Sequence, residues 1–184
     1  MTDQPDVGPI VLVGMMGTGK STVGRLVARS LGRAFYDSDA MIEARRHKTV
    51  AQLWEEGGEP AYRALETDVL GEALDARPAG VVAAAGGVVL AQVNRAVLRR
   101  VSERGGVVVW LRAAPEVLAG RVHPGDHRPL LREDPEGTLR RLAADRAAWY
   151  AEVADRVIDV GPMTADAVAQ AVLAEVEAHA GAHR

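Results

Sequence analysis

The sequence predicts an α/β protein in which one parallel β-sheet lies between two layers of helices, in a doubly wound arrangement. Near-continuous apolar runs at Ile10–Val13, Val81–Ala84 and Val107–Leu111 predict the central strands. These runs do not alternate with polar residues, which is typical of strands covered on both faces. Segments of helical periodicity separate the runs, and this alternation predicts right-handed βαβ units. We therefore expect a single three-layer domain over residues 1–184.

Weaker patterns complete the order of elements. Short strands are expected at residues 34–36 and 156–160. Apolar residues recur at helical spacing at positions 23, 26, 27 and 31, and again at positions 168, 172 and 176. Thr49 and Gln52 fit a capping box, which predicts the start of a helix. Prolines and a glycine interrupt residues 122–135, where we expect a mobile loop between helical segments.

The composition excludes several classes of protein. The 184 residues carry 22 Lys and Arg against 25 Asp and Glu, a net charge of −3, whereas a nucleic-acid binder needs a basic surface. The absence of cysteine excludes disulfides and thiolate zinc sites. The pairs His123/His127 and His179/His183 have no third ligand for zinc. The apolar runs are too short to span a membrane, and the first residues lack the basic segment of a signal peptide, so we expect a cytoplasmic protein.

The segment Gly14–Ser21 matches the pattern G-x-x-x-x-G-K-[ST] between an apolar strand and an amphipathic helix. Glycines at this spacing let backbone N–H groups surround phosphate oxygens, while Lys20 adds a positive charge and Ser21 can bind Mg²⁺. A chance glycine-rich turn would lack this context, so the pattern predicts a site for a nucleoside triphosphate. The guanine-reading motif N-K-x-D is absent and the chain leaves little room for motor modules, so a small-molecule kinase is the best fit.

Two carboxylates, Asp37 and Asp39, follow the second expected strand. One of them could hold Mg²⁺ through water while the other accepts a hydrogen bond from a substrate hydroxyl. Asp residues are also favoured at helix starts, so a capping role is the alternative. Ligands bind at the carboxyl ends of strands in open α/β sheets, which favours the functional interpretation.

Three further patterns have both a functional and a structural interpretation. Arg63 and Glu66 lie at spacing i, i+3 on a helical segment and would form an ordinary surface ion pair on spacing alone. Gly86 and Gly87 follow an expected strand and could bring amides close to a ligand, or could simply end that strand. Arg128, in the proline-rich loop, could stabilise charge on a transferred phosphoryl group, with a solvated surface role as the alternative.

Taken together, these motifs resemble the shikimate kinase family over roughly residues 9–180. The resemblance rests on the loop Gly14–Ser21, Asp37-Ser-Asp39, the segment Gly57–Glu66, Ala85-Gly86-Gly87, Arg128-Pro-Leu-Leu131, and Arg146 before Trp149-Tyr150. It implies transfer of the γ-phosphate of ATP to the 3-hydroxyl of shikimate, in aromatic amino-acid biosynthesis. It also implies a P-loop kinase fold like that of nucleoside monophosphate kinases, with a five-stranded parallel sheet. A helical substrate-binding region at about residues 38–66 and a lid at about residues 122–135 belong to that fold.

The resemblance also implies a role for each matching residue. Lys20, Asp39 and Arg128 would be catalytic. ATP would contact Gly17, Thr18, Gly19, Lys20, Ser21, Thr22, Arg121 and Arg128, with Arg121 against the adenine and the segment near Pro162 on its other side. Mg²⁺ would bind Ser21 directly, with Asp37 nearby. Shikimate would be held by Asp39, Arg63, Gly86, Gly87 and Arg146, with both arginines on its carboxylate and Glu66 supporting Arg63.

The chain departs from the family pattern at one position, and two alternative functions fit the same motifs. The family usually has a third glycine where this chain has Ala85, and a methyl group is tolerable there only at a negative φ. A kinase for another polyhydroxylated acid, gluconate-like or aminoshikimate-like, would use the same kind of site. A non-catalytic nucleotide-binding module would keep the fold without needing Lys20, Ser21, Asp39 and Arg128 together. We expect a monomer without nucleic-acid or membrane partners, and we interpret the tryptophans as core or lid packing.

Overall fold

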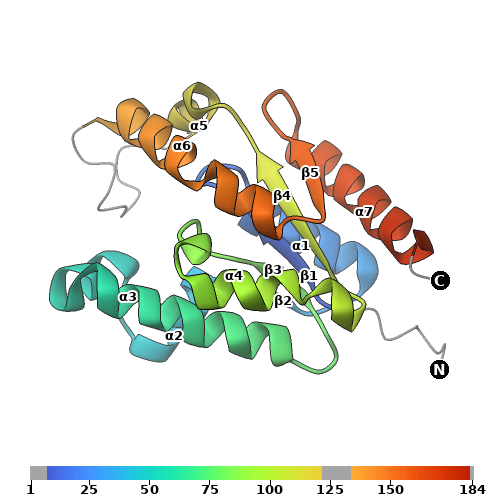
Figure 1. The fold of residues 1–184 in the computed structure, drawn as a ribbon, viewed down its shortest axis with the longest axis horizontal. Helices are drawn as coiled ribbons and strands as arrows, with labels where there is room; N and C mark the ends of the chain where they lie inside the picture. Colours follow the sequence, from blue (N-terminus) through green and yellow to red (C-terminus); the bar gives the residue numbers. More distant parts are fainter. Residues whose placement is uncertain (1–7, 122–133, 183–184) are drawn as a thin grey trace.

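A five-stranded parallel sheet forms the centre of the protein, as the sequence predicts (Figure 1). The structure is a computed structural model and describes residues 8–121 and 134–182. The strands are β1 (Ile10–Val13), β2 (Phe35–Asp37), β3 (Val81–Ala83), β4 (Val107–Arg112) and β5 (Arg156–Asp159). Their spatial order is β2-β3-β1-β4-β5, and every neighbouring pair is parallel. All carboxyl ends therefore meet at one edge of the sheet, where ligands bind in open α/β proteins.

The central strand shows why its sequence is apolar throughout. All four residues of β1 are fully buried, because successive side chains point to opposite faces and both faces are covered. Ile10 and Leu12 belong to one hydrophobic core, while Val11 and Val13 belong to the other. The two cores hold the sheet between two layers of helices.

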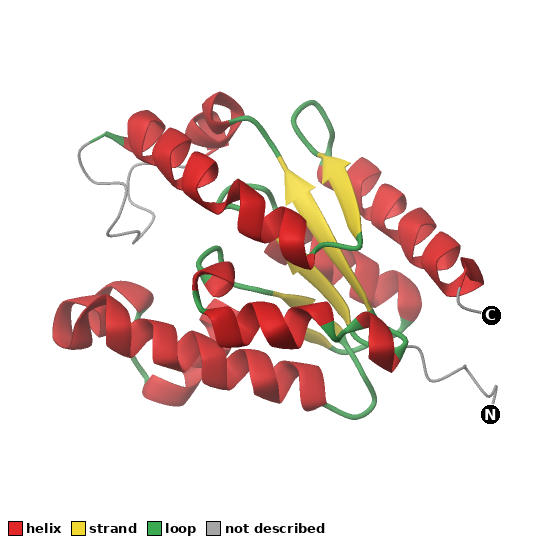
Figure 2. Ribbon diagram, in the orientation of Figure 1, coloured by secondary structure: helices red, strands yellow, loops and turns green. Residues whose placement is uncertain are grey.

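Helices cover both faces of the sheet, and Figure 2 shows them in red on either side of the strands. One face packs against α1 (Lys20–Leu31) and α7 (Ala165–Ala182). The other face packs against α3 (Val50–Asp75), α4 (Gln92–Arg99), α5 (Pro115–Arg121) and α6 (Pro135–Val153). Short 3-10 helices, η1 (Val88–Leu90) and η2 (Ser102–Arg104), flank α4. The predicted three-layer, doubly wound arrangement is thereby confirmed.

Residues 38–66, to which the resemblance assigns substrate binding, form α2 (Ser38–Arg46) and the first part of α3. α3 extends beyond the sheet (Figure 1) and shares a small core with α2, made of Ile42 from α2 and Leu53, Tyr62 and Val69 from α3. Thr49 begins α3 with the predicted capping box: Gln52 N donates to Thr49 Oγ1 at 3.2 Å, and Thr49 N donates to Gln52 Oε1 at 2.9 Å.

A kink interrupts α3. Gly58 takes φ 70° and ψ 179°, outside the helical region, and Pro60 follows within the same helix. Proline has no N–H to donate along the helix, and glycine tolerates a positive φ at low cost, so this pair bends the chain. The kink divides α3 into a short first arm and a longer second arm.

Element boundaries differ from the predicted ones by one residue at several strand ends. β2 begins at Phe35 and includes Asp37, because Asp37 is paired with Ala83 of the neighbouring strand. β4 likewise extends to Arg112, which is paired with Asp159 of β5. Sequence hydropathy ends these strands early because a polar residue can still take part in backbone pairing.

The predicted loop and lid at residues 122–135 lie almost entirely outside the described residues, as do Arg128, His123, His127 and His183. Of that segment, Asp134 caps α6 by accepting a hydrogen bond from Gly137 N at 3.0 Å. Within the described chain, no three His, Asp or Glu residues could hold a metal ion together. No described helix is long and apolar enough to cross a membrane.

Truncating the core side chain Val11 tests the burial of β1. Val11→Ala should lower the free energy of unfolding by about 2 kcal/mol, because two buried methyl groups are lost and a cavity is left. Val93→Ala on α4 is the matched control, since Val93 is 56% exposed. The control should change that free energy by about 0.5 kcal/mol or less. Urea unfolding measures both, and equal effects would contradict the burial.

Candidate active site

A cavity of about 310 Å³ opens at the carboxyl ends of β1, β2 and β3. Its walls come from the loop after β1, the start of α2, helix α3, the turn after β3, and α6. The lining residues are Met16, Gly17, Gly19, Lys20, Ser21, Thr22, Asp37, Asp39, Val50, Trp54, Tyr62, Arg63, Glu66, Ala83, Ala84, Ala85, Gly86, Gly87 and Arg146. Residues from distant parts of the sequence, most of them predicted site residues, therefore share one cavity.

The phosphate loop turns sharply between β1 and α1. Gly14, Gly17 and Gly19 have φ angles of 142°, 83° and 89°, a region that favours glycine. At Gly14, a Cβ would also overlap the carbonyl oxygen of Leu111. α1 then begins at Lys20 with no side-chain cap and no acidic residue in its first turn. An uncapped helix N-terminus beside a cavity attracts an anion.

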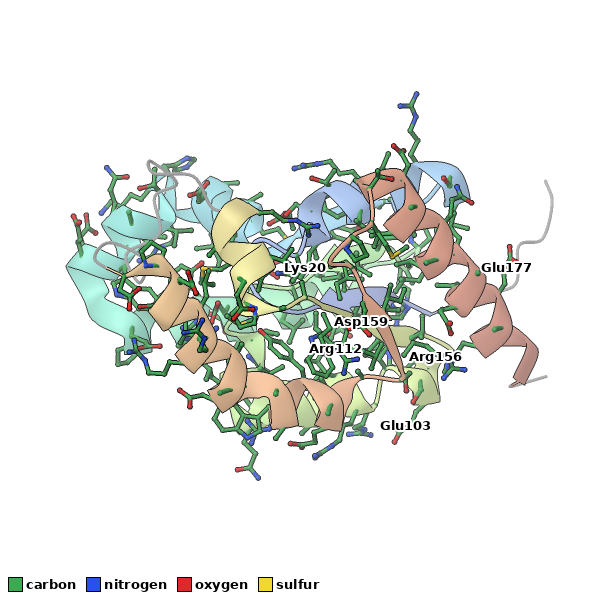
Figure 3. All side chains as sticks on the ribbon, turned by 90° about the horizontal axis from the view of Figure 1, so that it is seen from above. Lys20, Glu103, Arg112, Arg156, Asp159 and Glu177 are labelled. Carbon is green, nitrogen blue, oxygen red and sulfur yellow. The ribbon has the colours of Figure 1, made fainter. Side chains whose placement is uncertain are left out.

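The ammonium of Lys20 is folded back onto the loop. Its Nζ donates to the carbonyl oxygens of Gly14 at 2.8 Å and Met15 at 3.0 Å. Figure 3 shows Lys20 in the middle of the molecule, whereas Glu103 and Glu177 lie at the edge of the view. Lys20 is therefore held beside the cavity rather than in solvent.

Thr18 is the member of the predicted nucleotide-contact segment, residues 17–22, that does not line the cavity. It is 2% exposed, and its hydroxyl donates to the carbonyl oxygen of Met15 at 2.8 Å. The hydroxyl thus stabilises the loop from inside. A contact between Thr18 and a nucleotide stays a prediction.

Asp37 fulfils the capping alternative that the sequence left open, and it also lies at the cavity, where its Mg²⁺ role stays a prediction. It lines the cavity, and its Oδ1 accepts hydrogen bonds from Asp39 N at 3.1 Å and Ala40 N at 3.3 Å, so it also caps α2. The cap fixes the backbone of Asp39 at the cavity wall. Asp39 itself accepts a hydrogen bond at Oδ1 from the hydroxyl of Tyr62, at 2.7 Å.

Arg63 and Glu66 form a buried ion pair, so the expectation of a surface pair was wrong. Arg63 Nη1 lies 2.7 Å from Glu66 Oε2, and Arg63 also pairs with Glu59 at 2.9 Å. The side chain of Glu66 is 2% exposed and that of Arg63 is 16% exposed. Burial raises the pKa of Glu66, against the opposing charge of Arg63. The spacing i, i+3 could not reveal this depth, because it is the same on either face of a helix.

Trp54 shows the core packing expected of the tryptophans and also lines the cavity, a position that sequence reasoning missed. It packs on the small core shared by α2 and α3, and in the cavity the Arg63 guanidinium lies 5.3 Å from its ring centroid. Trp110 does fit the expected core role, since it is 8% exposed and stacks on Tyr150. The sequence pattern around the two tryptophans does not reveal which of them lines the cavity. The packing of the first arm of α3 decides it.

The turn after β3 is held by two donors from α6. Arg146 Nη1 and the hydroxyl of Tyr150 both donate to the carbonyl oxygen of Gly86, at 2.9 and 2.6 Å. A planar trans peptide points the N–H of Gly87 opposite to that carbonyl, so the two bonds fix the direction of this amide. Burial raises the pKa of Tyr150 to about 12, so its hydroxyl stays protonated.

Arg146 is 3% exposed, and within the described chain its Nε is buried without a hydrogen-bond partner. Arg146 also lines the cavity, so its buried positive charge borders the space in which an anionic ligand would bind. Ala85 lines the same cavity and does not adopt a positive φ, which meets the condition for a methyl group at that position.

Arg121 lies away from the cavity lining. Its Nη2 donates to the carbonyl oxygens of Val160 at 3.1 Å and Gly161 at 2.8 Å. These bonds tie the end of α5 to the turn that follows β5. The structure therefore brings together two segments that the resemblance places around adenine, and the adenine contact itself stays a prediction.

The sheet order and the phosphate loop place the protein among the P-loop kinases, and guanidinium groups across the same cavity indicate an anionic small-molecule acceptor. The family model described as shikimate kinase matches residues 16–177. A shikimate kinase of Bordetella avium is 44% identical over 172 residues, which cover 93% of this chain and 80% of that relative. The chain belongs to the shikimate kinase family.

Solved structures agree with this membership. A shikimate kinase from Acinetobacter baumannii, solved in complex with shikimate, is 39% identical with a TM-score of 0.87, and 94% of each chain is covered. A gluconokinase from Sinorhizobium meliloti has a TM-score of 0.57 at 23% identity, over 97% of this chain and 96% of that one. This second likeness shows the fold alone.

Adding a methyl group at Gly87 tests the buried ion pair. A Cβ there would overlap Nη1 of Arg63, although the φ of −93° at Gly87 suits alanine. Gly87→Ala should therefore displace the guanidinium from Glu66 and lower the free energy of unfolding by about 1.5–3 kcal/mol.

Gly71→Ala is the matched control for this substitution. A Cβ at Gly71 meets nothing within 4 Å, and the residue lies inside α3. The control should raise the free energy of unfolding by about 0.5–1 kcal/mol through helix propensity. Chemical denaturation measures both variants. An unchanged or raised free energy of unfolding in Gly87→Ala would show that Arg63 is not held against Gly87.

Proposed function

We propose that the protein transfers the γ-phosphoryl group of ATP to the 3-hydroxyl of shikimate, which yields shikimate 3-phosphate in aromatic amino-acid biosynthesis. The observation that carries the proposal is one cavity in which the phosphate loop faces Asp39, Arg63 and Arg146. Phosphoryl transfer needs two reactants placed in line and their charge neutralised, rather than covalent chemistry by the protein. Membership of the shikimate kinase family supports the same reaction.

The nucleotide end of the cavity is the phosphate loop with the start of α1. Backbone N–H groups of Gly17–Thr22 and the helix dipole receive the phosphates, and Lys20 moves from the loop carbonyls to the β- and γ-phosphates. Arg121 and Arg128 complete the proposed nucleotide contacts, although Arg128 lies outside the described residues. Lys20, Asp39 and Arg128 are the residues to which we assign catalysis.

The donor chemistry at this end fits Mg²⁺. The hydroxyl of Ser21 and the carboxylate of Asp37 both line the cavity, and hard oxygen ligands of this kind are what Mg²⁺ prefers. Ser21 would bind the ion directly and Asp37 would hold it through water. When bound, the ion neutralises charge on the phosphates.

The acceptor end of the cavity suits a hydroxylated carboxylic acid. The guanidinium groups of Arg63 and Arg146 both line the cavity and can bind a planar carboxylate. The fixed amides of Gly86 and Gly87 border the same space. Asp39 accepts the hydrogen bond of the attacking hydroxyl and orients its oxygen toward the γ-phosphorus.

The proposal includes a monomeric enzyme in the cytoplasm, where ATP is abundant. Another polyhydroxylated acid is the rival acceptor, because two arginines recognise a carboxylate without fixing the ring attached to it. The acceptor assay below separates the two.

A coupled assay for ADP tests the proposed reaction. ADP should form only when ATP, Mg²⁺ and shikimate are all present, because the acceptor supplies the attacking oxygen. Parallel reactions with gluconate, with nucleoside monophosphates and without an acceptor serve as controls. Equal ADP formation without shikimate, or none with it, would refute the proposal.

Removing the guanidinium of Arg63 tests the acceptor end separately. Arg63→Ala should weaken shikimate binding by about 1.5–3 kcal/mol, the value of a charged hydrogen bond, and leave ATP binding unchanged. Arg100→Ala is the control, since the Arg100 side chain is 74% exposed and pairs with Glu103 on the surface. Titration calorimetry measures both ligands. Unchanged shikimate affinity in Arg63→Ala would remove Arg63 from the site.

A further inference from the structure

Tyr62 is a residue to which the family resemblance assigns no role. It makes a hydrogen bond to Asp39 at the reacting end of the cavity. Its hydroxyl donates to Oδ1 of Asp39 at 2.7 Å, from the second arm of α3 across to the first turn of α2. Tyr62 is 3% exposed, whereas Asp39 is an exposed residue on the cavity wall. A fixed, buried donor thus holds one oxygen of the Asp39 carboxylate.

The direction of this bond does not change with conditions in the cell. Burial, followed by the charge of Asp39, raises the pKa of Tyr62 far above its ordinary value. The phenol therefore stays protonated and can only act as the donor toward an ionised Asp39. A hydroxyl that donates to a carboxylate makes one of the stronger hydrogen bonds found in proteins.

The ring of Tyr62 is itself immobilised. It packs in the small core with Ile42 and Leu53, and its centroid lies 5.5 Å from that of Trp54 at an interplanar angle of 50°. A buried aromatic ring has few accessible rotamers, so the position of its hydroxyl is set by the core. The small core of the helical region is thereby linked to a polar group at the cavity.

Asp39 is consequently fixed at two points. Its backbone N–H donates to Asp37 Oδ1 at 3.1 Å, which sets the position of the Cα atom. Its side chain receives the hydroxyl of Tyr62, which selects one orientation of the carboxylate among the staggered rotamers. Groups that are held in place before the substrate binds lose less freedom on reaching the transition state.

We propose that Tyr62 is a positioning residue for phosphoryl transfer, which orients the carboxylate of Asp39 toward the acceptor hydroxyl through its own hydroxyl group. This inference rests on the proposed function, because Asp39 receives the attacking hydroxyl in that reaction. Tyr62 does not touch the reacting atoms and acts only through Asp39. The ring and the hydroxyl have separate tasks, packing for the ring and orientation for the hydroxyl.

Tyr62→Phe separates these tasks, because it keeps the ring and removes the oxygen. With shikimate and ATP both saturating, kcat should fall about tenfold, since the carboxylate loses its orientation. The KM for ATP should stay within about twofold of the wild-type value, and the thermal midpoint within about 2 °C, because no packing changes. A kcat within twofold of the wild-type value would overturn the inference. A tenfold rise in the KM for ATP would also overturn it, because it would indicate that the whole site is disordered.

Two companion variants complete the test. Tyr36→Phe removes a phenol oxygen from β2, where the ring lies beside Gly80 at the amino end of β3 and does not line the cavity, and it should keep the wild-type kcat. Asp39→Asn leaves Tyr62 intact and should lower kcat at least as much as Tyr62→Phe; a wild-type rate in Asp39→Asn would also overturn the inference. The wild-type reaction with shikimate runs in parallel. If the wild-type protein does not turn over shikimate, the proposed function is refuted. If the wild type turns over shikimate and Tyr62→Phe has the same kcat, only the role of Tyr62 is refuted.

Discussion

One buried carboxylate, that of Glu66, determines how the acceptor half of the cavity is built. A charge in the protein interior is tolerated only where an opposite charge and hydrogen bonds offset its lost hydration. Arg63 provides both at 2.7 Å, so its guanidinium is drawn inward and packs against the backbone of Gly87. The turn after β3 can approach that closely only without a side chain. Arg146 then reaches the same turn from α6 and binds the carbonyl of Gly86.

The fold follows from patterns that can be recognised in the sequence. Unbroken apolar runs predicted β1, β3 and β4, because a strand covered on both faces has no polar side to present. The glycine and lysine spacing of Gly14–Ser21 predicted the sharp loop and the helix that begins at Lys20. Thr49 and Gln52 predicted a helix start correctly because a capping box is a local interaction.

The arrangement of the site depends on contacts that such local patterns do not contain. The depth of the Arg63–Glu66 pair depends on which face of α3 meets the sheet, and the position of Arg146 depends on how α6 packs. The resemblance identified both arginines as site residues but did not predict their contacts or their burial. It assigned no role to Tyr62, whose bond to Asp39 arises from a core shared between α2 and α3.

The internal hydrogen bonds of Lys20 have a consequence for selectivity. The loop offers its own carbonyl oxygens to the ammonium group, so an incoming anion must compete with two existing bonds rather than meet a bare charge. Ligand binding at Lys20 is therefore an exchange of hydrogen-bond partners. A polyphosphate gains from this exchange, because it also meets the uncapped helix end and several loop amides at once. In the proposed reaction, the resting position of Lys20 thus favours a polyphosphate, which meets several donors at once, over a ligand that meets the ammonium group alone.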